Sequence, residues 1–167
     1  GGGGWVLRAA GARAAARAAG RRDGVTTCRW QGPTPCEEWT VRAIADHITG
    51  GNRFAVLILG GASVDDAMTQ VRSGNFSDDP MTGFHDSASA QIDAFSRPGA
   101  MVDLCHHPVG QIPGQQFAGL RVGDLVVHAW DIARAVGADE NLDEELVREA
   151  FSVYEPMAEG FLDSGAF

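Results

Sequence analysis

The most regular pattern in the chain is an apolar stretch, residues 120–134, interrupted along one narrow stripe. On a helical wheel of about 100° per residue with Asp124 at zero, His128 falls at about +40° and Asp131 at about −20°. Most of the other positions are apolar: Leu125, Val126, Val127, Ala129, Trp130, Ile132, Ala133 and Val136. Because an ordinary surface helix carries a broad polar face, this pattern predicts a helix over 116–136 that is buried on most sides. Gly137 is its expected stop signal.

The polar stripe has two interpretations. It is either the solvent-facing side of an amphipathic helix, or a set of side chains that points into the domain, where polar groups need partners. A carboxylate and a histidine four residues apart lie one above the other on a helix, as in a two-point metal clamp. This stretch alone leaves both interpretations open.

A second helix is predicted upstream. Thr34, Pro35 and Glu37 have the spacing of a capping box with proline at the first helical position, which indicates a helix start. Thr40 offers a second cap, and residues 40–59 have helical periodicity. The apolar residues share one arc of the wheel: Val41, Ile44, Ala45, Ile48, Gly51, Ala55 and Ile58. Arg42 and Asp46 fall opposite, spaced for an ion pair.

His47 falls among the apolar residues of this helix and not with its charged neighbour Asp46. A single histidine on an apolar face is usually a core residue with a hydrogen-bond partner. A second histidine beside a carboxylate on another inward-facing stripe favours a joint site. Cys105, His106 and His107 form another group of metal-ligand types, but adjacent residues on a strand or loop point in different directions.

The remaining segments complete an all-α fold. We predict a short helix over 62–72, a loop over 75–80, a helix over 81–97 that ends at Pro98, an extended segment over 100–111 and a helix from 143. In the last helix Pro156 should produce a kink. Its predicted apolar positions are Leu146, Val147, Ala150, Phe151, Tyr154, Met157, Ala158 and Phe161. Residues 1–22 are rich in Ala and Arg, with a tag-like start at Gly1–Gly4, and are predicted to supply an N-terminal helix of the bundle.

Composition excludes several classes of protein. The length of 167 residues predicts a single domain, of which 23–167 form all but the first helix. A net charge of −9 argues against nucleic acid or an anionic membrane as the partner. The longest apolar run, 54–59, is too short to span a bilayer, and no signal peptide is evident. Three cysteines, Cys28, Cys36 and Cys105, form no disulfide framework, so the cytoplasm is the expected location.

Two motifs resemble a known family. The run Pro33-Thr-Pro-Cys-Glu-Glu-Trp-Thr-Val-Arg42, followed by Asp46-His47 and Gly50-Gly51-Asn52, resembles the opening motif of DinB-like metal-binding proteins. It is most similar to the N-terminal domain of mycothiol-dependent maleylpyruvate isomerase and its stand-alone relatives. The run Leu120-Arg-Val-Gly-Asp-Leu-Val-Val-His-Ala-Trp-Asp131 resembles the second metal-binding segment of that family.

The resemblance implies a DinB-like four-helix bundle with an additional C-terminal helix, and leaves room for a small hairpin near 100–113. It implies a divalent metal, zinc first with nickel or iron as alternatives, held by His47, Asp124 and His128. Many DinB-like proteins have His at the position of Asp124, and the isomerase type has Glu, so this chain carries a shorter ligand there. Asp131 and Arg134 are candidates for contacts with the ligand side chains, on the side away from the metal, or for contacts with substrate. The alternative for both is a surface ion pair.

Three protein ligands and one open position are the arrangement of a catalytic metal. The resemblance then implies a metal-dependent enzyme, a thiol-dependent S-transferase or isomerase that acts on a small electrophile with mycothiol as co-substrate. A metal-activated hydrolase and a non-catalytic, metal-stabilised module for a small ligand are the alternatives. The expected partners are a small-molecule substrate or thiol, with the chain as a monomer or homodimer.

Overall fold

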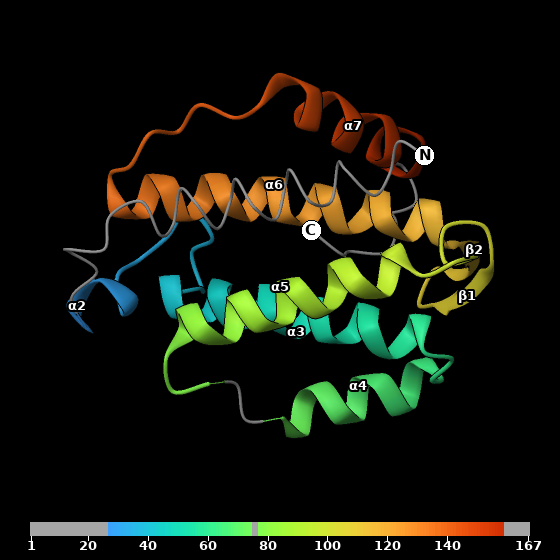
Figure 1. Ribbon diagram of the computed structural model, residues 1–167. Helices are drawn as coiled ribbons and strands as arrows, with labels where there is room; N and C mark the ends of the chain where they lie inside the picture. Colours follow the sequence, from blue (N-terminus) through green and yellow to red (C-terminus); the bar gives the residue numbers. More distant parts are fainter. Residues whose placement is uncertain (1–26, 75–76, 159–167) are drawn as a thin grey trace.

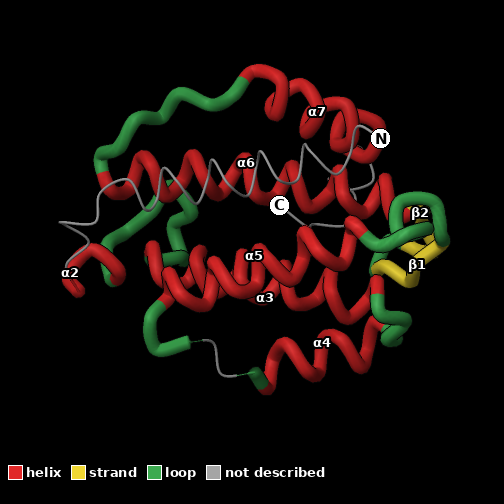
Figure 2. Tube along the Cα trace, in the orientation of Figure 1, coloured by secondary structure: helices red, strands yellow, loops and turns green. Residues whose placement is uncertain are grey.

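The computed structural model describes residues 27–74 and 77–158, and these residues are mainly helical (Figure 1). The elements in chain order are α2 Thr27–Trp30, α3 Val41–Leu59, α4 Val64–Ser73, α5 Pro80–Ser96, β1 Leu104–His107, β2 Gly110–Pro113, α6 Gly114–Val136, α7 Glu144–Tyr154 and the 3-10 turn η1 Glu155–Met157. The strands form a single antiparallel hairpin at one end of the helices (Figure 2). Within the described residues, no helix is long and apolar enough to cross a membrane.

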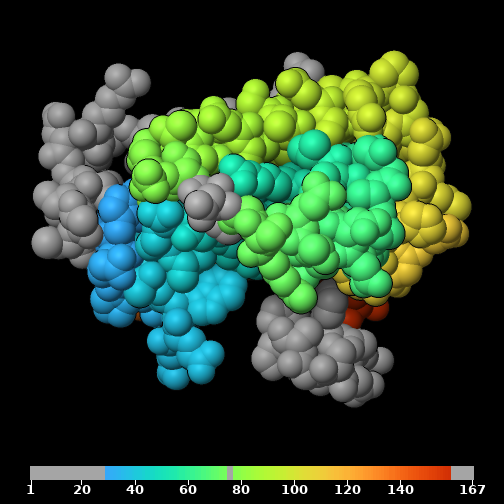
Figure 3. Space-filling model, turned by 90° about the horizontal axis from the view of Figure 1, so that it is seen from below, coloured from blue at the N-terminus to red at the C-terminus, as the bar shows by residue number. Residues whose placement is uncertain are grey.

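The fold is an all-α, DinB-like arrangement with an additional C-terminal helix. Helix α3 packs against both α5 and α6, α7 covers the side of α6 that faces away from α3, and α4 lies against α3 (Figure 1). Seen from below, α4 lies over α3 with α5 beside it (Figure 3). The predicted helices at 40–59, 81–97 and 116–136 are confirmed. The first helix of the predicted bundle falls in 1–22, outside the described residues.

Two apolar clusters hold these helices together. The larger cluster joins α3, α5, the hairpin and α6 through residues such as Ile58, Phe95, Ile112 and Phe117. The smaller one contains Ile44, Ile48, Phe84 and Leu125, with Trp39 packed at its edge. Burial of this apolar surface is the main stabilising term for the fold. Trp39 also contacts the rings of His47 and His128, so the smaller cluster adjoins these two histidines.

The start of α3 corrects one prediction. Thr40 caps the helix, as expected, because its side chain accepts a hydrogen bond from the backbone N–H of Ala43. The predicted helix start at Thr34 is wrong. The Thr34 hydroxyl accepts from the N–H of Cys36 and donates to the carbonyl of Trp39, while Pro33 and Thr40 form a β-bridge. The side chain of Thr34 therefore closes a turn and does not cap a helix. This turn places Cys36 and Trp39 immediately before the N-terminus of α3.

Replacement of Thr40 by alanine is expected to destabilise the fold by about 1 kcal/mol, because the N–H of Ala43 loses its acceptor. For a chain of this size that loss lowers Tm by roughly 2–4 °C, which thermal unfolding followed by circular dichroism measures. Thr69→Ala is the matched control, since Thr69 is exposed in α4. An equal loss in both variants would contradict a capping role for Thr40.

The other helix boundaries follow local signals. Asp79 caps α5 through the N–H groups of Met81 and Thr82, with Pro80 at the first position. Gly137 ends α6 in the left-handed conformation with φ 67°, which glycine adopts without strain. The small hairpin is confirmed at 104–113. Within it Cys105 is buried and His106 exposed, so successive side chains diverge as expected of a strand.

Helix α7 departs from its predicted face. Val147 and Phe151 were assigned to the apolar side, but they are 38% and 62% exposed. The contact with α6 is made through Leu146 and Tyr154, as predicted, and through Val153, which was not among the predicted positions. Tyr154 ends the α-helix and donates its hydroxyl proton to the carbonyl of Leu120. Pro156 lies in the 3-10 turn that follows, so the predicted kink takes the form of a helix end.

Candidate metal centre

Three side chains from two helices meet at one end of the smaller apolar cluster. His47 comes from α3, and Asp124 and His128 come from successive turns of α6. Asp124 Oδ1 lies 3.1 Å from His47 Nε2 and 3.5 Å from His128 Nε2. The three potential ligand atoms all lie within 4.8 Å of one another. The two helical stripes read from the sequence therefore face each other in the fold.

His47 occupies a more open position than its wheel predicted. Its side chain is 39% exposed, whereas that of the outward-facing Asp46 is 30% exposed and pairs with Arg42 at 2.8 Å. The neighbours Ile44 and Ile48 fill the core at this level of α3, which leaves the imidazole at the edge of the apolar arc. His47 therefore lies at the border of the apolar face and not within it, and this position gives the site an open side.

Trp39 forms a wall for the two imidazoles. Its ring lies 5.6 Å from that of His128 in a stacked arrangement with an interplanar angle of 20°, and 4.7 Å from that of His47. The two histidine rings meet edge to face at 4.9 Å. The indole therefore limits the rotation of both rings. Sequence reasoning missed Trp39, although its place immediately before the cap of α3 was a usable signal.

Asp124 is held as a carboxylate. Burial on its own would raise its pKa, but the hydrogen bond with His47 and the electrostatic interactions with Arg121, His47 and His128 outweigh burial and lower the pKa to about 2. Its second oxygen, Oδ2, accepts a 2.7 Å hydrogen bond from Arg121. The group is thus ionised at neutral pH, and only Oδ1 faces the imidazoles.

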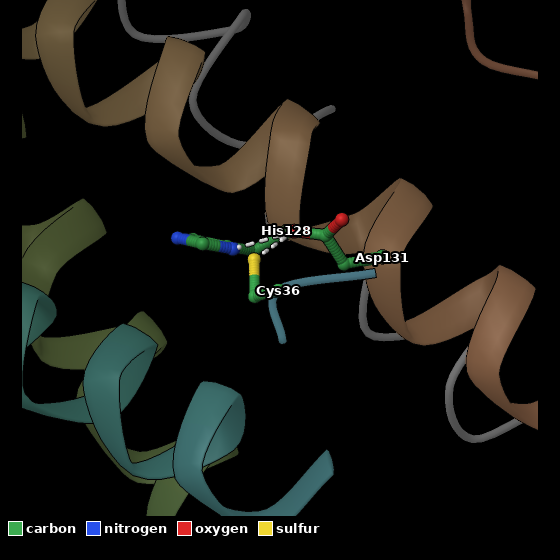
Figure 4. A group of neighbouring side chains, drawn as sticks. All are labelled: Cys36, His128 and Asp131. Carbon is green, nitrogen blue, oxygen red and sulfur yellow. Dashed lines mark hydrogen bonds and ion pairs between the residues drawn. The ribbon is translucent and has the colours of Figure 1, made fainter. Parts of the chain in front are cut away.

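Asp131 fixes the ring of His128 from behind (Figure 4). His128 Nδ1 lies 2.9 Å from Asp131 Oδ2, and the Asp131 side chain is only 4% exposed. In the tautomer with its proton on Nδ1 this contact is a hydrogen bond, and Nε2, which then carries a lone pair, faces Asp124 Oδ1. Histidines that ligate metals almost always donate the other ring N–H to such a partner.

Cys36 joins the same carboxylate from the turn before α3. Its thiol donates to Asp131 Oδ2 over 3.5 Å. Burial, followed by the charge of Asp131 and this hydrogen bond, raises the pKa of the Cys36 thiol, so it stays protonated. Cys36, His128 and Asp131 form a second group with ligand-like spacing. Because their polar atoms already bond to one another, we interpret this group as the support of His128.

Arg134, the other candidate behind the ligands, lies elsewhere. It pairs with Glu140 at 3.2 Å, and its guanidinium lies 5.1 Å from the centre of the Trp130 ring. Both partners of the ion pair are about half exposed, at 56% and 43%. Arg134 therefore fits the surface ion pair that the sequence left open as the alternative.

The donor set fits a divalent metal. Two imidazoles and a carboxylate are ligands of zinc and of non-haem iron. Donors about 2.1 Å from a tetrahedral ion lie roughly 3.4 Å apart, and the observed separations from Asp124 Oδ1 are 3.1 and 3.5 Å. Fold and site together define a helical bundle that gathers a two-histidine, one-carboxylate cluster at one end.

Comparison with known proteins identifies the family. The chain belongs to the mycothiol maleylpyruvate isomerase N-terminal domain family, whose sequence model matches residues 11–133. Uncharacterised proteins from two strains of Mycobacterium tuberculosis are each 37% identical over 119 residues. The aligned part covers 71% of this chain and 60% of each relative, so the chain spans about 60% of the length of the curated relatives. No solved structure matches significantly.

Proposed function

We propose that the chain binds a divalent metal ion, zinc first, through His47, Asp124 and His128, and uses it in a thiol-dependent transfer or isomerisation with a low-molecular-weight thiol such as mycothiol. The orientation of His128 is the observation that best supports metal binding. With Nδ1 bonded to Asp131, the lone pair of Nε2 faces a carboxylate oxygen 3.5 Å away. When His128 is neutral with its proton on Nδ1, these two electron-rich atoms repel each other; a divalent cation between them would remove that repulsion, as would a second proton on His128.

The arrangement also supports catalysis over a purely structural role. Structural zinc is usually closed by four protein ligands, whereas catalytic zinc keeps a position open. Three donors converge here, and His47 lies on the exposed side. A bound divalent ion lowers the pKa of a coordinated thiol, so that thiolate is available at neutral pH.

The side chains around the ligands would prepare the site for an anionic sulfur. Asp131, 2.9 Å from Nδ1, would favour the tautomer of His128 that carries its proton on Nδ1. Trp39 shields one side of both imidazoles from water, which strengthens electrostatic interactions there. Because Cys36 contributes a free thiol that donates to Asp131, we place this function in a reducing cytoplasm.

The test begins with the elemental composition of the purified protein. We expect about one metal ion per chain and a rise in Tm when zinc is added to metal-free protein. At a free metal concentration of 100 times Kd the stabilisation is about 2.7 kcal/mol, which is a rise of roughly 5–11 °C for a chain of this size. Absence of both effects with zinc, nickel and iron would overturn the proposal.

Turnover then separates the proposed enzyme from its alternatives. A thiol-dependent enzyme should consume a small electrophile only when metal and thiol are both present. A metal-activated hydrolase should turn over with metal and no thiol. A binding module should show metal-dependent melting and ligand-induced stabilisation without turnover. The last two outcomes would each replace the thiol-transfer proposal while leaving the metal site in place.

A further inference from the structure

A buried arginine lies directly behind the candidate ligand Asp124. The side chain of Arg121 is 9% exposed. Its guanidinium donates to three groups: NH1 to Asp124 Oδ2 at 2.7 Å, Nε to Gln91 Oε1 at 3.1 Å, and NH2 to Asn52 Oδ1 at 3.0 Å. A charged group removed from water is destabilising unless it is paired and hydrogen-bonded. Here each of the three nitrogen atoms has an acceptor, from α6, α5 and α3 respectively.

The surroundings of Arg121 are shaped to hold it in one position. Asn52 is fully buried and donates in turn to Ser87, which donates to the carbonyl of Phe84. Gly51 provides the space, because a Cβ at this position would lie 2.5 Å from Arg121 NH1 and 2.7 Å from Cζ. The guanidinium is therefore fixed by a hydrogen-bonded chain on one side and by close packing on the other.

This fixed group restricts the carboxylate of Asp124. A free carboxylate can rotate and can bind a metal through one oxygen or through both. Arg121 occupies Oδ2, so Oδ1 alone lies beside His47 and His128. Aspartate is also a short side chain, and its reach toward the imidazoles depends on how its carboxylate is turned.

We propose that Arg121 is a positioning residue that holds Asp124 as a one-oxygen ligand and presents Oδ1 to the metal. This inference rests on the proposed function, since it assigns a role to Arg121 only if the three ligands bind metal. Arg121 acts through Asp124 and not on substrate. Gln91 and Asn52 would serve the same purpose one step further away, by fixing the guanidinium.

Arg121→Met is the decisive variant, because it removes the charge and all three hydrogen bonds with a side chain of similar length. We expect its affinity for zinc to fall by about 10–100-fold, as is typical for groups that orient ligands. Arg121→Lys should recover part of the loss, since it keeps the charge without the planar fork. Affinity is measured by competition with a chelator, and Tm is measured on the metal-free protein.

Two further measurements show whether Arg121→Met acts on the position of Asp124 or only on the stability of the fold: a variant in the apolar core and the absorption spectrum of bound Co²⁺. Ile58→Ala removes a fully buried side chain from the larger cluster, away from the ligands, and should lower Tm while leaving zinc affinity unchanged. With Co²⁺ in place of zinc, Arg121→Met should weaken the visible absorption, because a two-oxygen carboxylate raises the coordination number above four. If Arg121→Met does not fold, Gly51→Ala is the substitute, since it displaces the guanidinium and keeps its charge.

The outcomes distinguish the two proposals. Lower affinity and an altered Co²⁺ spectrum in Arg121→Met, with neither in Ile58→Ala, support positioning. Wild-type affinity and spectrum in Arg121→Met, or an equal loss of affinity in Ile58→Ala, overturn the role of Arg121 and leave the metal site standing. Failure of the wild-type protein to bind zinc, nickel or iron would remove the proposed function, and the inference would fall with it.

Discussion

Replacement of His128 by alanine is expected to abolish tight metal binding while the helical bundle remains folded. The loss should exceed the roughly 100-fold cost of changing a group behind a ligand, because one of three protein donors is removed and only water can replace it. The core of α6 stays in place, since Phe117, Leu120 and Val126 are buried independently of the site. Metal content after dialysis and the circular dichroism spectrum provide the two readouts.

Asp46→Ala is the matched control for this variant. Asp46 directly precedes a proposed ligand, but it lies on the outer side of α3, where it pairs with Arg42 at 30% exposure on both partners. Such pairs contribute little, and its loss should change stability by no more than about 0.5 kcal/mol. Metal content should equal that of the wild type. Equal metal content in Asp46→Ala and His128→Ala would show that the inward-facing imidazole is not a ligand.

The helices were predictable from sequence where their signals are local. Thr40, Asp79 and Gly137 mark helix ends through contacts within three or four residues, so the sequence carries the whole signal. Thr34 carries an equally good capping pattern and begins no helix. The Thr34 hydroxyl could either cap a helix or close the turn between Pro33 and Thr40. In the folded chain it closes the turn, and the sequence alone does not distinguish the two.

The candidate site was predictable in part, for a related reason. Periodicity assigned His47, Asp124 and His128 to two stripes, and the fold places these stripes together. Cys36 was missed because its partner, Asp131, is 95 residues away in sequence. Arg121 is only three residues from Asp124, a readable spacing, but the contact with Asn52 that helps to bury its guanidinium is 69 residues away. A wheel gives directions around one helix but no information on what packs beside it. The same limit explains the assignment of the exposed Phe151 to the packed face of α7.

A substantial loss of stability is expected from a substitution at the junction between α6 and α7. Gly123 faces the ring of Tyr154 so closely that a Cβ at this position would lie 2.0 Å from Cε2 and 2.7 Å from Cδ2. Gly123→Ala therefore requires the ring or all of α7 to move away, which also weakens the hydrogen bond from Tyr154 to Leu120. Overpacking of this kind costs about 1–3 kcal/mol, whereas alanine improves helix propensity by at most about 1 kcal/mol. We expect a lower Tm and easier proteolysis of α7.

Two further variants show whether this clash is the cause. Gly119→Ala, one turn earlier on the same face, places its Cβ 2.6 Å from Cγ2 of Val153 and at least 3.4 Å from the other Val153 atoms, and rotation of the valine can relieve this one close contact, so the loss should be smaller. In a Tyr154→Ala background the space beside Gly123 is open. There Gly123→Ala should become neutral or stabilising, because the better helix propensity of alanine then acts alone. If Gly123→Ala lowers the stability equally in the wild type and in Tyr154→Ala, glycine is required at this position for a reason other than the packing of the Tyr154 ring.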